Sequence, residues 1–460
     1  MKHLKTVRER VTRRRAIVGA LGLLLVILLV AAACGEDATP TPRPATAVPA
    51  PTTVPAAPAP TAVPAAPAPT PVPGQIIVTV APSPAPTTQI RPIEEWTEEN
   101  PATLEEIEAQ LEKHRGESCV YVGWGGGDQA AVSAAWLLPF TEEFGIEIIQ
   151  DSPVLYAKFR AMAETGNITW DVGNGSGQAS WDLGQTDVLE ELDFSIIDRR
   201  DFQDGSTGPW FGQSITWSNV VSYSNKAVDE LWGGQAPKTM ADIFDMEKFP
   251  GDRAFASPNW SWKTTLRFAL LSDDPSLADT PGMPALAQLS PEQVDRAFEI
   301  LTDFAPNVRV WWTNGTECAQ LIESEEVVIC TSWNGSMFSA QQEGSNSTTC
   351  WECGHLMATN PWWIPMGMKE QDPNKFELLQ LWMAWTSFPE RQAEYSKFIS
   401  NGSVNVEAGA LLVGPDYDET GPEIPSNPQN AQFGILGDEK WDGDNSPTIG
   451  ERWVEWQQGL

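Results

Sequence analysis

Strand-like and helix-like stretches alternate between residues 119 and 176, and this alternation restricts the fold more than any other feature of the sequence. The strand-like runs are 119–124, 146–149 and 170–176, and the stretches with helical spacing are 136–144 and 155–163. Pro139 is expected to break or kink the first helix. The order of strands and helices favours an α/β fold with a parallel sheet. Ligands of such sheets bind where the strands end, so residues at those ends are candidates for a binding site.

Several candidate binding residues lie at strand ends. Trp124 ends the first strand, Asp128 lies in the glycine-rich loop that follows, and Ser176 lies in the polar loop after the third strand. A later strand-like run, Val327–Ile329, leads to Trp333 and an Asn-Gly pair. A strand that brings a Trp to the mouth of a cleft makes a platform for a ligand. The alternative is that Trp333 is a core residue followed by an ordinary Asn-Gly turn.

The first 34 residues have the pattern of an export signal. Residues 8–15 are basic, residues 16–33 are apolar, and three alanines precede Cys34. Small residues directly before a Cys resemble a bacterial lipobox, which implies cleavage before Cys34 and attachment of a lipid to its sulfur. The alternative is an uncleaved membrane anchor, because an apolar segment of this length can just span a bilayer. Both interpretations place the rest of the chain outside the cytoplasmic membrane.

Residues 35–92 consist almost wholly of Pro, Ala, Thr and Val. Such a composition cannot form a core, and its prolines favour an extended conformation. We expect a disordered tether that holds the folded part away from the membrane. A short acidic helical lead-in is expected over 93–116, where Leu104, Ile107 and Leu111 recur at helical spacing.

The charge of the chain limits its partners. The formal charge is −33, and the first 34 residues contribute +6, so the remainder carries about −39. This charge repels nucleic acid and anionic lipid surfaces, so we expect no nucleic-acid partner. Most of the carboxylates are expected to be solvated, although their field also favours cationic ligands. We expect a monomer without a cofactor or a metal ion.

Five cysteines follow the expected lipidation site, and an exported protein pairs most of its cysteines. Cys318 begins a short helix and Cys330 lies on the strand that runs back beside it, so these two residues can meet. Cys350 and Cys353 can close a small loop, which leaves Cys119 over. The alternative is a metal site made by the C-x-x-C pair and a nearby His, but no second ligand pair has the right spacing.

Seven short motifs occur in a definite order. They are Phe-Thr-Glu-Glu-Phe-Gly-Ile at 140–146, Tyr-Ala-Lys at 156–158, Trp-Asp-Val at 170–172, Trp-Ser-Asn-Val-Val-Ser-Tyr-Ser-Asn at 217–225, Ala-Pro-Asn-Val at 305–308, Ser-Trp-Asn-Gly-Ser at 332–336 and Asn-Pro-Trp-Trp-Ile-Pro at 360–365. With these motifs the chain resembles the extracellular solute-binding proteins of ABC importers, and among them the spermidine/putrescine-binding branch. The resemblance covers about 117–410.

The resemblance implies an α/β fold of two lobes, the periplasmic-binding-protein type II architecture, in which strands cross between lobes that close over one solute. Lobe 1 is expected to comprise 117–220 and about 364–400. Lobe 2 is expected to comprise 221–363 and about 401–460. The family also implies an ABC permease as the partner to which the solute is delivered.

The family further implies which residues contact the solute. Trp124, Ser176, Trp333 and Trp363 match ligand-contacting positions, and Trp217 begins the crossing strand beside them. For each of them, the alternative is a packed core Trp or a solvated loop Ser.

The chain departs from the polyamine-binding pattern at two places. Pro365 stands where the family has an Asp that holds an ammonium group, and 258–263, after the strand-like run 253–256, has no acid. A buried ammonium group without a counter-charge is costly, which argues against a simple polyamine. Trp260 and Trp262 alternate on a segment expected to be extended, so both can face the cleft and join a cage for a quaternary ammonium group, a heterocycle or a sugar ring. The alternative is that both pack under a lobe.

The sequence therefore predicts a lipid-anchored receptor that delivers a small cationic or aromatic-stacking solute to an ABC importer. Polyamine-like, betaine-like or choline-like compounds and heterocyclic amines are the expected solutes. The alternatives are a surface-anchored glycoside hydrolase, a sugar-binding lipoprotein, and a scaffold or adhesin domain on a stalk. Against an enzyme, no carboxylate pair stands out and the Gly-x-Ser-x-Gly nucleophile motif is missing.

Overall fold

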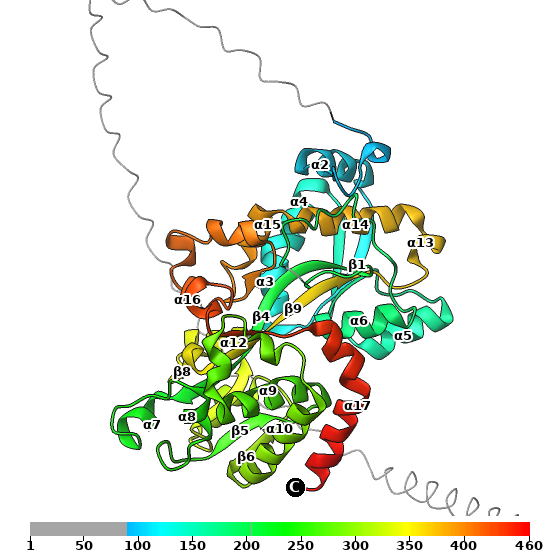
Figure 1. Ribbon diagram of the computed structural model, residues 1–460. Helices are drawn as coiled ribbons and strands as arrows, with labels where there is room; N and C mark the ends of the chain where they lie inside the picture. The colour runs from blue at the N-terminus through cyan, green and yellow to red at the C-terminus, as the bar shows by residue number, and fades with distance from the viewer. Residues whose placement is uncertain (1–89, 204) are drawn as a thin grey trace, which may run out of the picture. The chain divides into compact units, whose positions relative to one another are not determined.

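The computed structural model describes residues 90–203 and 205–460, which belong to one compact unit, and Figure 1 shows their arrangement. The expected signal segment, the lipidation site Cys34 and the tether up to residue 89 lie outside these residues. Among the described residues, no helix combines the length and the apolarity that a membrane span requires.

In the described part of the chain, eleven strands form one mixed sheet. They are β1 (Ser118–Val122), β2 (Glu147–Asp151), β3 (Val172–Asn174), β4 (Phe211–Ser224), β5 (Arg253–Ala256), β6 (Val308–Trp312), β7 (Ile329–Trp333), β8 (Ser347–Thr349), β9 (His355–Trp363), β10 (Gly402–Ser403) and β11 (Gly434–Leu436). The strand order is β2-β1-β3-β9-β4-β7-β5-β6, with β8 and β10 paired to β4 and β11 paired to β9.

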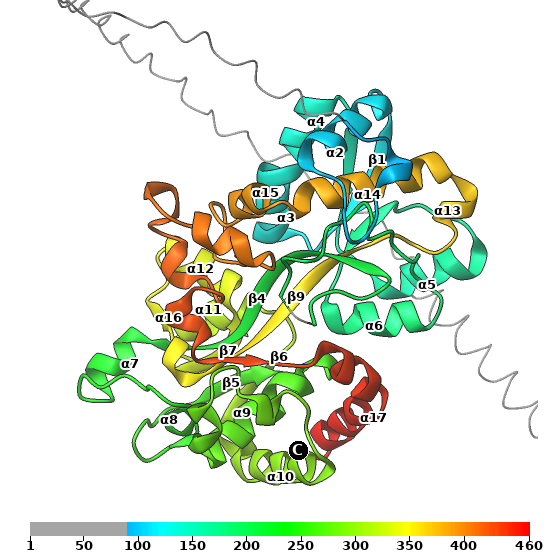
Figure 2. The ribbon, with the colours of Figure 1, turned by 45° about the horizontal axis from the view of Figure 1, so that its top comes forward.

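The sheet consists of two parallel halves joined by two long strands. β1 pairs in parallel with β2 and β3, and β5 pairs in parallel with β6 and β7. Between these halves, β9 pairs antiparallel with β3, and β4 pairs antiparallel with both β9 and β7. β4 and β9 therefore run from one half to the other, as Figure 2 shows. The predicted crossing strand at 217–225 corresponds to β4, which begins earlier, at Phe211.

Helices cover both halves of the sheet. They are α2 (Leu104–Leu111), α3 (Gly126–Val132), α4 (Leu138–Phe144), α5 (Tyr156–Thr165), α6 (Gly177–Gln185), α7 (Asn225–Glu230), α8 (Met240–Phe244), α9 (Trp262–Asp273), α10 (Pro291–Phe304), α11 (Glu317–Glu323), α12 (Asn334–Gln342), α13 (Met368–Gln371), α14 (Pro373–Ser387), α15 (Pro389–Tyr395), α16 (Pro428–Ala431) and α17 (Glu439–Gln458).

Each half has its own apolar core, and we call the two halves lobe 1 and lobe 2. Lobe 1 contains β1–β3 with α2–α6 and α14, and Trp136, Trp362 and Trp382 lie in one of its core clusters. Lobe 2 contains β5–β7 with α8–α10, and Phe255 and Leu266 lie in its largest cluster. Separate cores allow the lobes to move as units about the crossing strands. The predicted residue boundaries of the lobes stay predictions.

The C-terminal helix α17 contacts both lobes. In lobe 1, Gln178 Nε2 of α6 donates to the Asp442 carbonyl at 3.4 Å. In lobe 2, Arg267 of α9 donates to Asp442 Oδ1 at 2.8 Å, and Trp453 Nε1 donates to the Ser257 carbonyl at 3.0 Å. Figures 1 and 2 show α17 running from α6 towards α10.

The predicted interruption near Pro139 is confirmed. Helix α3 leads into a π-helical turn over Ser133–Leu137 and then into α4, which carries Pro139 in its first turn. Proline lacks an N–H group, so it fits a first turn better than a helix interior. The turn places Trp136 in the core, where its Nε1 donates to the Arg391 carbonyl at 2.6 Å.

The alternative that an Asn-Gly turn follows Trp333 is wrong. Asn334 and Gly335 begin α12 instead. The Asn334 side chain accepts a hydrogen bond from Ser218 N and donates to the Ser400 carbonyl, both at 2.8 Å. These contacts with distant segments hold the Asn side chain inside the protein, which a local turn preference does not anticipate.

Two disulfides lie within the described residues. Cys318 at the start of α11 is joined to Cys330 on β7 with a Cα–Cα distance of 5.8 Å. Cys350 is joined to Cys353 with a Cα–Cα distance of 5.3 Å. Cys119 is free and buried on β1, and burial raises the pKa of its thiol to about 12, so it is unreactive at neutral pH.

We expect the first disulfide to contribute more to stability than the second. Cys318 and Cys330 are 12 residues apart and Cys350 and Cys353 are 3 apart, so the first closes the longer loop in the unfolded chain. Replacing Cys318 and Cys330 by serine should lower the free energy of unfolding by about 3 kcal/mol, and the matched change at Cys350 and Cys353 by about 1 kcal/mol less. Urea unfolding of both double variants measures this, and the reverse order would contradict it.

Candidate ligand-binding site

Three indoles form a group where the crossing strands meet lobe 2. Trp217 on β4 and Trp333 at the end of β7 meet edge to face, with ring centroids 6.3 Å apart. Trp260 stacks on the other side of Trp333 at 5.9 Å and an interplanar angle of 29°. All three are half-buried. We call Trp217, Trp260 and Trp333 the indole group. Strands β5 and β7 are parallel, so their carboxyl ends place Trp260 and Trp333 at one edge of the sheet.

A second aromatic pair lies at the strand ends of lobe 1. Trp124, after β1, is 38% exposed and meets Tyr156 of α5 edge to face at 6.3 Å. The Tyr156 hydroxyl donates to Ser176 Oγ at 3.3 Å. Ser176 lies in the short loop after β3, as expected, and its side chain accepts from Ala179 N and caps α6.

Asn360 on β9 connects the indole group to the aromatic pair of lobe 1. Trp217 Nε1 donates to Asn360 Oδ1 at 2.7 Å. The Asn360 carbonyl accepts from Asn174 Nδ2 at 3.1 Å, and Asn174 ends β3, two residues before Ser176. The crossing strand therefore carries hydrogen bonds from the indole group to the loop that leads into α6. Asn360 lies in one of the seven motifs, but nothing in the sequence distinguishes it as a binding residue.

The structure does not bring all predicted tryptophans to the surface between the lobes. Trp262 is fully buried in the core of lobe 2, against Trp441 of α17. Trp363 is also fully buried, and its Nε1 donates to Ser180 Oγ of α6 at 2.7 Å. It packs behind Tyr156 at 5.3 Å, so it supports the lobe 1 pair from behind.

The expectation that Trp260 and Trp262 lie on an extended segment is wrong. They occupy a 3-10 turn, Asn259–Ser261, followed directly by α9. Residues two positions apart in a helical segment point in different directions, so only one of the two indoles reaches the indole group. The other is covered by α17, a segment more than 170 residues later in the chain.

The expectation that Asp128 lies in a glycine-rich loop is wrong, because Gly126 already begins α3 and Asp128 lies in its first turn. Its Oδ1 accepts a hydrogen bond from the Tyr395 hydroxyl at 2.6 Å, and its Oδ2 is enclosed without a partner among the described residues. Burial raises the pKa of Asp128 from 3.8 to about 6, and the Tyr395 hydrogen bond opposes this shift only in part. The carboxylate is therefore costly to ionise in the folded protein.

Asp128→Asn should stabilise the protein at neutral pH. The folded-state pKa lies above the unfolded value, so the folded state binds this proton more tightly between about pH 4 and 6, and the benefit is lost as the pH rises through 6. An amide keeps the acceptor for Tyr395 but carries no charge. We expect about 1–3 kcal/mol more stability than wild type at pH 7.5, and a difference near zero at pH 4. Urea unfolding at both pH values tests this, and a difference that does not change with pH would contradict it.

Glu439, the first residue of α17, lies beside α6 and β9 and was missed by sequence reasoning. Its carboxylate accepts from Thr359 N at 2.9 Å and from Thr359 Oγ1 at 2.6 Å. A Cβ atom built on Gly177 would lie 1.8 Å from Glu439 Oε2, so only glycine fits there. Burial raises the pKa of Glu439, against the effect of nearby Lys263. No local sequence pattern predicts that Glu439 lies beside α6 and β9, because its position is set by the path of the chain after β11.

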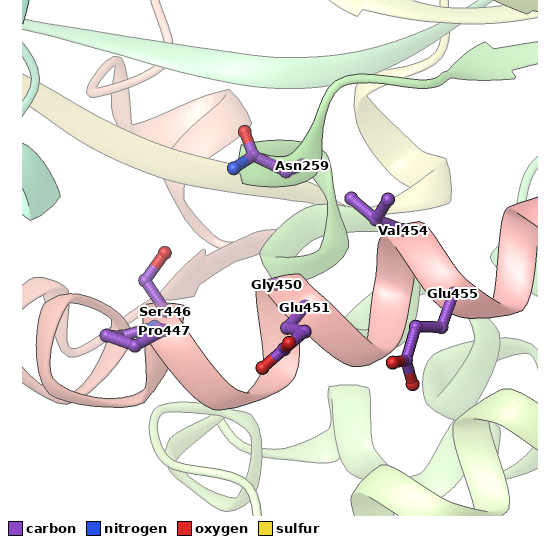
Figure 3. A pocket seen from close by; sticks show the side chains of 7 residues that line it. All are labelled: Asn259, Ser446, Pro447, Gly450, Glu451, Val454 and Glu455. Atoms are coloured by element: carbon purple, nitrogen blue, oxygen red, sulfur yellow. The ribbon is translucent and has the colours of Figure 1, made fainter. Parts of the chain in front are cut away.

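A pocket of about 390 Å³ lies between α17 and the 3-10 turn that carries Trp260. It is lined by Asn259, Ser446, Pro447, Gly450, Glu451, Val454 and Glu455. Figure 3 shows Asn259 above the face of α17, with the carboxylates of Glu451 and Glu455 directed away from it. None of the predicted binding residues lines this pocket, and its two acids do not converge on a ligand.

The alternative metal site at Cys350 and Cys353 does not form. These residues are joined by a disulfide, and His355 is engaged elsewhere, with Nδ1 2.8 Å from Ser218 Oγ and Nε2 3.0 Å from the Asn430 carbonyl. Burial lowers the pKa of His355 to about 4. In the part of the chain that the structure describes, no group of three or more Cys, His, Asp or Glu residues is arranged to hold a metal ion.

Two lobes, parallel strands that end on each side of long crossing strands, and aromatic side chains at those ends define a class of protein. It is the class of receptors that enclose a small solute between two lobes.

The chain belongs to the family described as bacterial extracellular solute-binding proteins, whose pattern it matches over residues 135–431. It is 27% identical to the gamma-aminobutyric acid-binding protein of Pseudomonas aeruginosa over 350 residues, which cover 74% of this chain and 91% of that protein. The solved structure of a receptor for GABA (γ-aminobutyric acid) shares 30% identity with a TM-score of 0.62, covering 74% of this chain and 98% of that chain. An ABC transporter substrate-binding protein from Bradyrhizobium japonicum shares 27% identity with a TM-score of 0.65, covering 75% of this chain and all of that chain.

These similarities confirm the predicted two-lobed fold and the role of a solute receptor for an ABC importer. The relatives are substrate-binding proteins, so the glycoside hydrolase alternative is set aside and the chain is not an enzyme. The predicted assignment to the spermidine/putrescine-binding branch of the family is less well supported. A spermidine/putrescine-binding protein from Streptococcus pneumoniae has a TM-score of 0.55 but only 17% identity, which shows the common fold alone.

Proposed function

We propose that this chain is a lipid-anchored receptor that captures a small solute with an ammonium or other cationic group between its lobes and delivers it to an ABC permease. The observation that carries this proposal is the indole group. Trp217, Trp333 and Trp260 contact one another in series at the carboxyl ends of two parallel strands, beside the crossing strands.

Indole faces attract cations because the π-system is electron-rich, and the attraction strengthens when water is excluded. Closure of the lobes would exclude water from these rings. Trp333 Nε1 is buried without an acceptor among the described residues, so it is free to donate to a solute atom. A solute that favours the closed state in this way shifts the equilibrium between open and closed lobes.

The relatives support a small amino compound as the solute. Two of them are named for binding γ-aminobutyrate, which carries an ammonium group at one end and a carboxylate at the other. The missing acids at Pro365 and over 258–263 argue against a polyamine, whose two ammonium groups need two anionic partners. We therefore rank amino acids and betaines above polyamines and sugars.

The anchor follows from the sequence at Cys34. Labelling with a fatty acid in the native host, or a close bacterial relative, should mark the wild-type chain and leave a Cys34→Ser variant unlabelled. An equal level of label in both chains would contradict lipidation at this residue.

The solute is tested by thermal unfolding and calorimetry of the purified full chain with γ-aminobutyrate, glycine betaine, choline, putrescine and glucose. A receptor gains stability with the logarithm of solute concentration above its Kd, and it does so without turnover. We expect a rise in melting temperature with at least one ammonium compound. A response to glucose alone would favour the sugar-binding alternative and contradict the proposal.

A further inference from the structure

Lys263, in the first turn of α9, has a largely buried side chain whose ammonium group makes no direct contact with a described acid. It is 4% exposed as a residue, its ammonium nitrogen is not fully enclosed, and it makes no hydrogen bond or ion pair with any described residue. The two buried arginines of lobe 2 differ in this respect. Arg253 donates to the carbonyls of Ile243 and Phe249, and Arg267 donates to two carbonyls of the 284–287 segment and to an Asp side chain. Buried charges are normally paired, so the ammonium of Lys263 is available to an anionic partner.

The position of Lys263 is fixed from two sides. It follows Trp260 by three residues in one continuous helical segment, so the two side chains lie on the same side of that segment. Trp260 stacks on Trp333, so this side faces the indole group. On the other side, the carboxylates of Asp442 and Glu439 are close enough to oppose the lowering of the Lys263 pKa that burial causes. Lys263 therefore lies between the indole group and the start of α17.

The neighbouring carboxylates are already engaged. Glu439 accepts two hydrogen bonds from Thr359, and Asp442 Oδ1 accepts from Arg267 at 2.8 Å. Ser261 makes no side-chain hydrogen bond to the first turn of α9, which continues directly from the 3-10 turn Asn259–Ser261. With the neighbouring acids engaged elsewhere, the ammonium group of Lys263 favours a further anion beside it.

We propose that Lys263, in the first turn of α9, binds an anionic group of the solute, a carboxylate, while the indole group binds its ammonium end. The solute is then a zwitterion with separated charges, such as an ω-amino acid. This inference rests on the proposed function, since it names a second contact for the same solute. It also explains how a site without acids at 258–263 can bind a solute. Where the polyamine-binding pattern has an acid for an ammonium group, this chain has a lysine for a carboxylate.

The experiment uses calorimetry on the purified full chain to compare carboxylates with analogues that lack the carboxylate. The probes are γ-aminobutyrate against 4-aminobutanamide, and glycine betaine against choline. We expect wild type to bind at least one carboxylate at least 30-fold more tightly than its uncharged or purely cationic analogue. In Lys263→Met, this preference should fall to less than threefold, mainly through weaker binding of the carboxylate. Lys238→Met, which removes an exposed lysine of lobe 2, is the matched control and should keep the preference.

Each outcome is decisive. Equal or tighter binding of amides, choline or putrescine in wild type overturns the Lys263 site but leaves the proposed function standing. Binding of no ammonium compound at all overturns both. If Lys263→Met does not fold, Lys263→Arg keeps the charge and should keep a preference for the carboxylate, whereas Lys263→Gln should lose it. A preference that survives in Lys263→Gln would show that another residue binds the anion.

Discussion

Replacing Trp333 by alanine is expected to weaken solute binding about 30- to 1000-fold, which corresponds to the ~2–4 kcal/mol lost when a central aromatic contact is truncated. Trp333 is the middle ring of the indole group and also meets Trp312 at 6.0 Å. Its removal takes away a cation-binding face and leaves Trp217 and Trp260 without the ring between them. Calorimetry with the solute that stabilises wild type most measures the change.

Trp456→Ala is the matched control for this prediction. Trp456 is also half-buried, but it lies on α17 against α10, where its Nε1 donates to Thr302 Oγ1 at 3.0 Å. This variant should lose stability yet bind with wild-type affinity. Gly315→Ala provides an intermediate test, because its Cβ would lie 2.5 Å from a ring atom of Trp333 and would displace the indole. A Trp333→Ala variant with affinity within threefold of wild type would rule out the indole group as the binding surface.

Asp442→Asn is expected to lower the free energy of unfolding by about 3–5 kcal/mol, because it leaves a buried guanidinium without its counter-charge. The side chains of Arg267 and Asp442 are 0% and 2% exposed, with Nη2 and Oδ1 2.8 Å apart. The pair joins α9 to α17, so its loss should also loosen the helix that contacts both lobes. Urea unfolding, followed by far-UV circular dichroism, measures the change in midpoint.

Asp444→Asn is the control on the same helix. Asp444 pairs with Lys440, and both side chains are more than 40% exposed, so the pair contributes at most about 1 kcal/mol. A loss of similar size in both variants would mean that α17 is sensitive to any change of charge, and that the buried pair with Arg267 has no special role. A loss below about 1 kcal/mol for Asp442→Asn would contradict the prediction directly.

Much of the fold could be predicted from the sequence because it depends on local periodicity. The alternation of strands and helices over 119–176 is observed, and so is the π-helical interruption before Pro139. The positions of Trp124 and Trp333 at strand ends also follow from short apolar runs, whose side-chain period is two residues. The order of motifs identified the family, although it placed the chain too close to the polyamine-binding branch.

The orientation of individual side chains could not be predicted in the same way. Trp260 and Trp262 are two residues apart, and the sequence offers no reason to separate them. In the structure a 3-10 turn directs Trp260 to Trp333, and α17 covers Trp262. Whether a short segment is helical or extended, and which of its side chains are buried, depends on the element that packs against it. Here that element is α17, which comes from the end of the chain.

By itself, the sequence determined the α/β class, the crossing strand and which strand ends carry an indole, because these follow from patterns within ten or so residues. Only the tertiary structure decided which indoles stay accessible, that Lys263 makes no hydrogen bond or ion pair with a described residue, and that Glu439 lies beside α6 and β9. The physical reason is that burial and pairing are properties of neighbours in space. Lys263 and Glu439 are separated by 176 residues in sequence, and only the packing of α17 against both lobes brings them close together.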